Sequence, residues 1–262
     1  MSALAPSSVS ALLPRAALVT GGGRRIGRAI ALDLARQGFA IAVHYSRSRD
    51  EAEAVVAEIT AGGGAAVALA ADLARETEVA AIIGRAGAAL GPLGLLVNNA
   101  SAFERDDALG ATRASWDLHM EVNLRAPFVL CQDFARQLPP SAEGLVVNLL
   151  DQRVWSLTPH FTSYTLSKAG LWAATQTLAL ALAPRIRVVG IGPGPALPSS
   201  RQSTEQFAAQ VAELPLARGT SPEEVCRTLR FLLETPSITG QMIALDGGQH
   251  LGWATGGTAP QE

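Results

Sequence analysis

Thr20-Gly21-Gly22-Gly23-Arg24-Arg25-Ile26-Gly27 follows a short apolar stretch, residues 16–19, and leads into an amphipathic stretch over residues 26–37. A strand, a glycine-rich turn and a helix in this order present free backbone amides and the positive end of a helix dipole, which favour a phosphate group. Arg25 occupies a middle glycine position of the usual dinucleotide fingerprint, and the alternative is a glycine-rich turn without a ligand. We predict a nucleotide site with the cofactor-binding residues Gly21, Arg24, Arg25, Ile26 and Gly27.

Strand-like and helix-like stretches alternate along the remainder of the chain. The predicted strands are 16–19, 40–44, 65–70, 93–97, 144–149, 186–191 and 242–245, and the predicted helices are 26–37, 50–60, 76–90, 162–183, 222–234 and a long helix within 112–138. This alternation predicts an α/β fold, a single-domain Rossmann-type doubly wound parallel sheet of about seven strands with helices on both faces. Ligands of such sheets bind at the carboxyl ends of the strands.

Length and composition favour one domain and argue against several classes of protein. We predict a single domain over residues 15–252, a disordered N-terminal extension over 1–14 and a C-terminal tail over 253–262. A net charge of -2 gives no electrostatic case for nucleic acid, and no apolar run approaches the length of a membrane span. The extension lacks the basic region of a signal peptide, and Cys131 and Cys226 fall in apolar helical patterns, so we expect a cytoplasmic protein.

The end of the second predicted strand indicates which dinucleotide binds. An NAD site usually has an acidic residue there for the ribose hydroxyls. This chain instead has His44-Tyr45-Ser46-Arg47-Ser48, where Arg47 and Ser48 offer hydrogen bonds to a 2′-phosphate, with Tyr45 and Arg24 as further contacts. The alternative is a solvated basic loop. We predict NADP, as NADPH, to be the cofactor.

The ends of the third and fourth predicted strands supply further cofactor contacts. Asp72, followed by Leu73, is placed to hold the edge of the adenine. Asn98 ends the fourth strand, and backbone and amide groups after it can line the cofactor cleft. The cofactor-binding residues predicted here are Asp72, Leu73, Asn99, Ala100 and Ser101.

Lys168 is the only lysine of the chain, and it follows Tyr164 by four residues. This spacing puts both side chains on one face of a helix. An ammonium beside a phenol favours the phenolate and lowers a pKa that starts near about 10, so that the tyrosine can transfer a proton near neutral pH. The alternative is a surface pair, because such spacings arise by chance on many helices.

Together these motifs resemble the short-chain dehydrogenase/reductases over about residues 15–252. The resemblance rests on the T-G-x-x-x-R-x-G turn, Asn98-Asn99-Ala100, Asn123, Tyr164-x-x-x-Lys168, Pro193-Gly194 and Asp246-Gly247-Gly248. It implies that Tyr164 is the catalytic acid and base, and that Lys168 binds the nicotinamide ribose and lowers the pKa of Tyr164. It further implies that Asn123 holds a proton-relay water, that Pro193 and Gly194 contact the cofactor, and that the protein is a homotetramer.

Asp151 departs from that family pattern. Thirteen residues before the tyrosine the family generally has a serine that hydrogen-bonds a substrate carbonyl, whereas an ionised carboxylate can only accept hydrogen bonds, as from ring N–H or amino groups. Asp151, Arg25 and segments 44–48 and 99–103 resemble the pteridine reductase branch, while 20–27 and 245–251 resemble bacterial dihydromonapterin reductases, which also reduce dihydrofolate. The alternatives are a helix or loop cap for Asp151 and core packing for Phe103.

The resemblance implies NADPH-dependent reduction of a C=N bond in a small-molecule pterin or folate. Tyr164 gives the proton, assisted by Asp151 and Lys168. The implied substrate-binding residues are Arg25, Ser101, Phe103, Asp151 and Tyr164, of which Phe103 stacks on the pterin. Trp155, His160 and Phe161 are candidates for the pocket wall, and residues 195–203 are a candidate lid.

Two rival functions stay open at this point. The first is an NADPH-dependent carbonyl or 3-oxoacyl reductase of the same family, against which Asp151 argues. The second is a non-catalytic NADP-binding regulator, against which Asn123, Tyr164 and Lys168 argue. We expect no metal, no nucleic acid and no membrane as partners.

Overall fold

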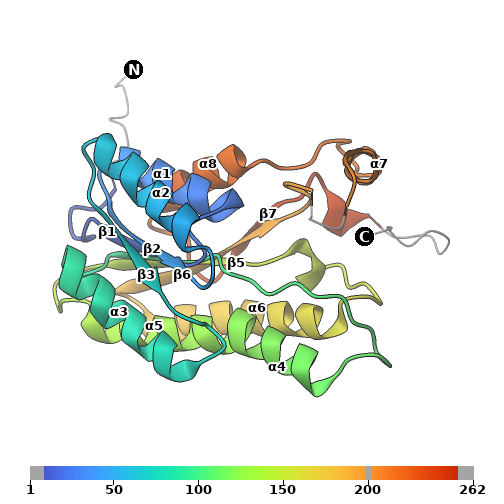
Figure 1. Ribbon diagram of the computed structural model, residues 1–262, viewed down its shortest axis with the longest axis horizontal. Helices are drawn as coiled ribbons and strands as arrows, with labels where there is room; N and C mark the ends of the chain where they lie inside the picture. Colours follow the sequence, from blue (N-terminus) through green and yellow to red (C-terminus); the bar gives the residue numbers. More distant parts are fainter. Residues whose placement is uncertain (1–8, 199–201, 253–262) are drawn as a thin grey trace.

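A parallel sheet with helices on both faces forms the protein, as a computed structural model that describes residues 9–198 and 202–252 shows (Figure 1). The seven strands run in the order β3-β2-β1-β4-β5-β6-β7, and every pair is parallel. The predicted fold class is therefore confirmed. The strands are β1 Ala16–Val19, β2 Ala40–Tyr45, β3 Ala66–Ala70, β4 Leu95–Asn98, β5 Gly144–Leu149, β6 Ile186–Pro193 and β7 Met242–Leu245. The helices are α1 Arg25–Arg36, α2 Arg49–Ala61, α3 Glu76–Leu90, α4 Arg113–Met120, α5 Ala126–Gln137, α6 Thr162–Leu182, α7 Thr204–Ala212 and α8 Pro222–Glu234.

The strand order reverses beside β1, and this reversal places the site. β1 pairs with β2 on one side and with β4 on the other, with Val19 opposite Val43 and Val97. The connections that leave β1 and β4 therefore diverge at their carboxyl ends, and a crevice opens between them. Doubly wound sheets bind their ligands at such a switch point.

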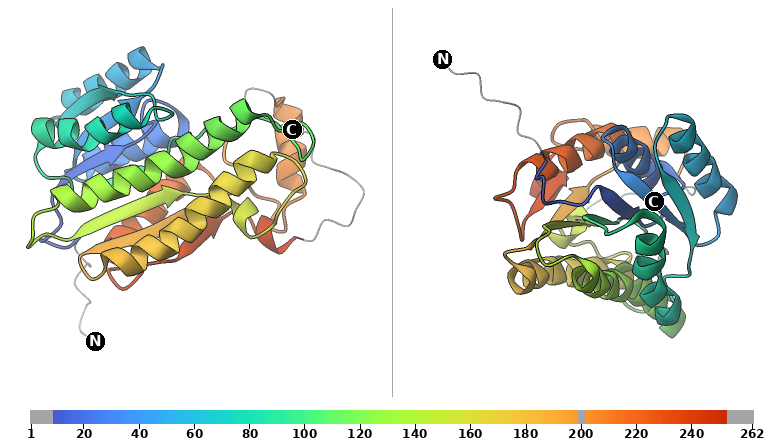
Figure 2. Two further views of the ribbon diagram at one scale, coloured as in Figure 1. Left: turned by 90° about the horizontal axis from the view of Figure 1, so that it is seen from below. Right: turned by 90° about the vertical axis from the view of Figure 1, so that its left-hand side faces the viewer.

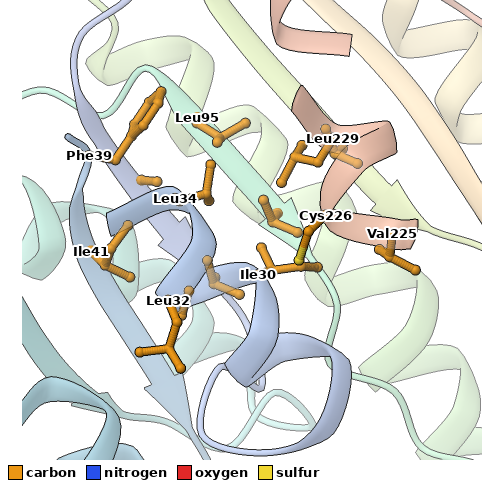
Figure 3. Packing of buried hydrophobic residues seen from close by; sticks show 14 of the residues in the cluster. Ile30, Leu32, Leu34, Phe39, Ile41, Leu95, Val225, Cys226 and Leu229 are labelled. Atoms are coloured by element: carbon orange, nitrogen blue, oxygen red, sulfur yellow. The ribbon is translucent and has the colours of Figure 1, made fainter. Parts of the chain in front are cut away.

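Two helical layers bury the sheet. Helices α1, α2 and α8 cover one face, and α3, α5 and α6 cover the other, with α5 and α6 side by side (Figures 1 and 2). On the first face Ile30 and Leu34 of α1 pack with Leu229 of α8 against Leu95 of β4, and all four are almost fully buried (Figure 3). Because both faces of the sheet are covered, its central strands are buried and mostly apolar, and the buried polar residues Asn98 of β4 and Asn148 of β5 are hydrogen-bonded to each other at 2.8 Å.

The predicted long helix over 112–138 is interrupted. α4 passes into one π-helical turn, Glu121–Arg125, before α5 begins, and this turn contains the buried residue Asn123. Such turns insert one residue into a helix and occur often at functional sites. No proline or glycine marks the turn itself, so hydrophobic spacing alone did not predict it.

Helix α7 was not predicted, although its start carries a recognisable signal. Ser203 accepts a hydrogen bond from the Gln206 amide, and the Gln206 side chain accepts one from the Ser203 amide. This reciprocal pair is a capping box, which S-x-x-Q in the sequence indicates. The predicted lid over 195–203 overlaps residues 199–201, which lie outside the described residues, and it stays a prediction.

The N-terminal extension differs from the prediction over residues 9–14. Leu13 is 5% exposed and belongs to the core on the α1 side of the sheet, so this stretch is anchored by apolar burial. Residues 1–8 and the tail 253–262 lie outside the described residues. Within residues 9–198 and 202–252, no helix combines the length and apolar character needed to cross a bilayer.

Candidate active site

The turn between β1 and α1 is shaped to approach a ligand closely. Gly21 has a φ of +62°, and a Cβ on Gly27 would lie 2.2 Å from the Gly21 carbonyl oxygen, so only glycine fits at position 27. α1 starts without a side-chain cap and without an acidic residue in its first turn. Its first amides and its dipole are therefore suited to an anion, such as a phosphate group of the predicted nucleotide.

His44 holds this turn in place, a role that the sequence did not reveal. Its Nδ1 accepts a hydrogen bond from the Gly21 amide at 3.1 Å, and its Nε2 lies 3.1 Å from the Ala71 carbonyl oxygen, to which it donates. Burial lowers the pKa of His44 to about 4, so the ring stays neutral and keeps one nitrogen as an acceptor. His44 thus couples the end of β2 to the glycine turn.

The end of β4 is fastened to the same turn. The Thr20 hydroxyl accepts hydrogen bonds from the amides of Asn99 at 2.9 Å and Ala100 at 3.0 Å, and the Asn99 side chain donates to the Thr20 carbonyl at 2.8 Å. The side chain of Asn99 therefore supports the cleft from behind. Its predicted contact with the cofactor would have to be made by its backbone.

The remaining predicted cofactor residues lie on neighbouring strand ends. Arg47 is exposed after β2, and Ser48 is the residue directly before α2. Arg24 forms an exposed ion pair with Glu51 at 3.5 Å, on the α2 side of the turn. Asp72 caps the turn after β3, where its carboxylate accepts from the Ala74 amide at 3.0 Å. Two others are packed inward: Tyr45 lies against the core, and Leu73 is buried.

The three polar groups of the predicted catalytic centre are close together. The Tyr164 hydroxyl donates to Asp151 Oδ2 at 2.8 Å, and Lys168 Nζ lies 5.8 Å from the centre of the Tyr164 ring. Lys168 Nζ donates to the Leu149 carbonyl at 2.7 Å. Burial lowers the pKa of Lys168 to about 8, against the opposing influence of the Asp151 charge. A phenol placed between a carboxylate and a buried amine is suited to proton transfer.

Asp151 uses its two oxygens for two different tasks. Oδ1 accepts from the Arg153 amide at 2.8 Å and caps the 3₁₀ turn Gln152–Val154, while Oδ2 accepts from Tyr164. The cap considered as an alternative role is therefore present, and it leaves the second oxygen for the phenol.

Asn123 clamps the loop after β4 to α6. Its Oδ1 accepts from the Ala102 amide at 2.8 Å and from the Ser101 hydroxyl at 3.2 Å. Its Nδ2 donates to the Ala102 carbonyl at 2.9 Å and to the Ser167 hydroxyl at 3.0 Å. The implied water relay at Asn123 stays a prediction. What the contacts establish is a structural link between Ser101 and α6, the helix that carries Tyr164.

Aromatic rings flank Tyr164. Phe103 stacks on Phe161, with ring centroids 4.4 Å apart, and meets the edge of Tyr164 at 4.7 Å. Arg153 lies over the Phe103 ring at 5.4 Å. Phe161 therefore covers one face of Phe103, a contact that the predicted stacking of Phe103 on the pterin did not include.

A cavity of about 230 Å³ opens beside Asp151. It brings together predicted residues from separate parts of the chain: Arg25, Ile26, Phe103, Asp151, Pro193 and Gly194. Phe207 and Gln210 of α7 also line it, and the sequence did not single them out. Arg25 donates to the Leu197 and Pro198 carbonyls at 3.2 and 2.9 Å, and so joins the glycine turn to the loop before α7. Trp155 was expected in the wall, but its ring packs edge-on against Trp172 and His250.

Among residues 9–198 and 202–252, no group of three or more His, Cys, Asp or Glu side chains is placed to hold a metal ion. The expectation that the protein binds no metal stays a prediction.

Comparisons with known proteins find similarity over nearly the whole length of the chain. The model of the family described as enoyl-(acyl carrier protein) reductase matches residues 22–250. A 3-oxoacyl-(acyl-carrier-protein) reductase from Synechocystis sp. is 35% identical over 246 residues, covering 92% of this chain and 98% of that protein. The crystal structure of FolM alternative dihydrofolate reductase 1 from Brucella suis, in complex with NADP, is 53% identical, with a TM-score of 0.90 over 94% of this chain and 98% of that one. The Brucella canis protein of the same name, also with NADP, is 52% identical, with a TM-score of 0.90 over 95% and 98%.

Proposed function

The chain belongs to the short-chain dehydrogenase/reductase family, and on that premise we propose that it reduces a C=N bond of a pterin with NADPH. One observation carries the proposal: the hydroxyl of Tyr164 is bonded to the carboxylate of Asp151 at 2.8 Å, at the edge of a cavity lined by Phe103. A carboxylate repels the oxygen of a ketone but accepts hydrogen bonds from the amino and ring N–H groups of a pterin. The similarity to the two Brucella proteins supports the same substrate class.

The roles of the chain's own groups follow from their positions. NADPH supplies the hydride when it is bound in the cradle of the glycine turn. Tyr164 gives the proton to the ring nitrogen, and Asp151, as its hydrogen-bond partner, supports the return of a proton to the phenol. Lys168, behind the phenol ring, stabilises the phenolate that forms. Arg25, after β1, and Phe103, after β4, reach the cavity from the carboxyl ends of neighbouring strands and orient the flat substrate.

Carbonyl reduction is the competing function, because 3-oxoacyl reductases also match over nearly the whole chain. The test is NADPH oxidation with 7,8-dihydromonapterin, dihydrobiopterin, dihydrofolate and a set of ketones and 3-oxoacyl thioesters. We expect turnover of a dihydropterin, with dihydrofolate slower. Good turnover of ketones and none of any pterin would refute the pterin assignment. A protein that binds NADPH but turns over no substrate would instead be a regulator.

A homotetramer and a cytoplasmic location stay predictions.

Arg47 and Ser48 should make the enzyme prefer NADPH to NADH. Both lie at the carboxyl end of β2, where the 2′-phosphate is expected, and a charge-assisted contact is worth about 1.5–3 kcal/mol, or roughly ten- to hundred-fold. Arg47→Asp should erode or reverse the preference, measured as the ratio of kcat/KM for the two cofactors. Arg49→Asp is the matched control, because Arg49 is paired with Glu53 at 2.7 Å on α2. Equal kcat/KM of the wild type for NADPH and NADH would contradict the assignment.

A further inference from the structure

Asp106 is a buried carboxylate to which the proposed mechanism gives no role. It lies in the loop after β4 and is 8% exposed. Oδ1 accepts from the Ser163 amide at 3.1 Å, while Oδ2 accepts from the hydroxyls of Ser163 and, at 3.1 Å, of Ser115. Burial opposes its ionisation, but these hydrogen bonds outweigh burial and hold the pKa of Asp106 below its usual value.

Ser163 also links Asp106 to His119, and the direction in which each hydrogen is donated along this chain is defined. The Glu104 amide can only donate, and it donates to His119 Nε2 at 3.0 Å, so this nitrogen carries no proton. Nδ1 therefore carries the proton of the neutral ring and donates to Ser163 Oγ at 2.6 Å, and Ser163 in turn donates to Asp106. Burial lowers the pKa of His119, which keeps the ring neutral. His119 and Ser163 are both fully buried.

This chain of hydrogen bonds lies at the start of the catalytic helix. The residue before α6, Phe161, has a φ of +58° and gives the helix no side-chain cap. The side chain of Asp106, 57 residues before Ser163, accepts the hydrogen bond from the Ser163 amide that an N-cap side chain would normally accept. The carbonyl of Asp106 also accepts from the Phe161 amide at 2.8 Å. The capped residue, Ser163, directly precedes Tyr164.

Asp106, Ser163 and His119 join several of the segments that surround Tyr164. Asp106 and the Glu104 amide belong to the loop that carries Phe103, and Phe103 stacks on Phe161. The His119 ring meets the Tyr164 ring edge-on at 6.0 Å. One buried hydrogen-bond network therefore fixes the loop after β4, helix α4 and the first turn of α6 relative to one another.

We propose that Asp106, Ser163 and His119 are positioning residues that hold the phenol of Tyr164 and the Phe103–Phe161 pair in a fixed relation at the substrate cavity. The proposal rests on the proposed function only in taking Tyr164 as the proton donor. None of the three residues touches the reacting atoms. Their effect passes through the start of α6 and through the loop after β4.

Asp106→Asn tests the proposal, because it keeps the size of the side chain but places a donor where one carboxylate oxygen accepts. A displacement of the proton donor by about 1 Å costs about 100-fold, so we expect a loss in kcat of roughly ten-fold or more, with a raised substrate KM. The Kd for NADPH should stay within about two-fold, since the glycine turn is fastened by His44 and Thr20. Hydrogen exchange should accelerate in the 161–167 segment.

Ser115→Ala is the matched control. It removes one hydrogen bond from the same carboxylate oxygen but none that reaches α6. We expect a lower Tm, because Ser115 also closes the capping box of α4, with unchanged kcat and KM. Ser163→Ala removes the hydroxyl that links His119 to Asp106. This variant tests the proposal if Asp106→Asn does not fold.

Assays use whichever substrate the wild type reduces fastest, so failure of the pterin assignment and failure of the positioning role are separate results. Wild-type kcat and KM in folded Asp106→Asn and Ser163→Ala, whatever their Tm, would overturn the proposal. An equal loss of kcat in Ser115→Ala would overturn it as well, because the effect would then come from stability alone.

Discussion

Tyr164→Phe is expected to keep NADPH bound and to lower turnover by about 10²- to 10⁴-fold, the usual contribution of a general acid. The substitution removes only the hydroxyl, which donates to Asp151 at 2.8 Å. Tyr164 is 6% exposed, and a phenylalanine ring would stay buried at the same position and keep the edge contact with Phe103. Binding and folding should therefore change little while the proton donor is lost.

The measurement is kcat with the best substrate, beside the Kd for NADPH and the Tm. Thr177→Val serves as control, because it removes a hydroxyl from an exposed position of the same helix, where it is bonded to the Ala173 carbonyl. That variant should retain wild-type kcat. If Tyr164→Phe turned over substrate at the wild-type rate, the proton would have to come from another group.

The fold was predictable because the signals that define it are local. Strands with covered faces contain continuous apolar runs, as in Leu18-Val19 and Leu145-Val146-Val147, and most helices end shortly before a glycine or proline. β1, α3, β5, α8 and β7 begin and end at the residues expected. Where the boundaries differ, tertiary contacts decide, as at Leu13, whose burial depends on a core that the local sequence does not contain.

The candidate site was predictable only in part. The sequence motifs identified residues at spacings that proton transfer requires, and Asp151, Tyr164 and Lys168 do lie together. The supports of that centre were not predictable, because they join residues far apart in the chain. His44 reaches Gly21, and Asp106 reaches Ser163, through contacts that no spacing in the sequence encodes.

Asp151→Ser should separate pterin reduction from ketone reduction. Serine is a good N-cap and can still accept from the Arg153 amide, so the 3₁₀ turn should persist. The charged acceptor that we propose for pterin N–H groups is lost, and so is the partner of the Tyr164 hydroxyl. The Asp151 charge also raises the pKa of Lys168, so its removal should move the loss of the Lys168 proton to lower pH.

We therefore expect pterin turnover by Asp151→Ser to fall about 10²- to 10³-fold, from the combined loss of a charge-assisted bond and of support for the acid. The alkaline limb of its pH profile should lie at lower pH than in the wild type, where the pKa of Lys168 is about 8. The serine hydroxyl can donate to a carbonyl, so slow ketone reduction should appear. Asp133→Ser, on α5, is the control for loss of a carboxylate, since Asp133 pairs only with Arg136 on its own helix among the described contacts. If Asp151→Ser kept the wild-type pterin kcat, and if the alkaline limb of its pH profile lay at the same pH as in the wild type, Asp151 would serve only as a cap. Substrate choice would then be decided elsewhere in the cavity.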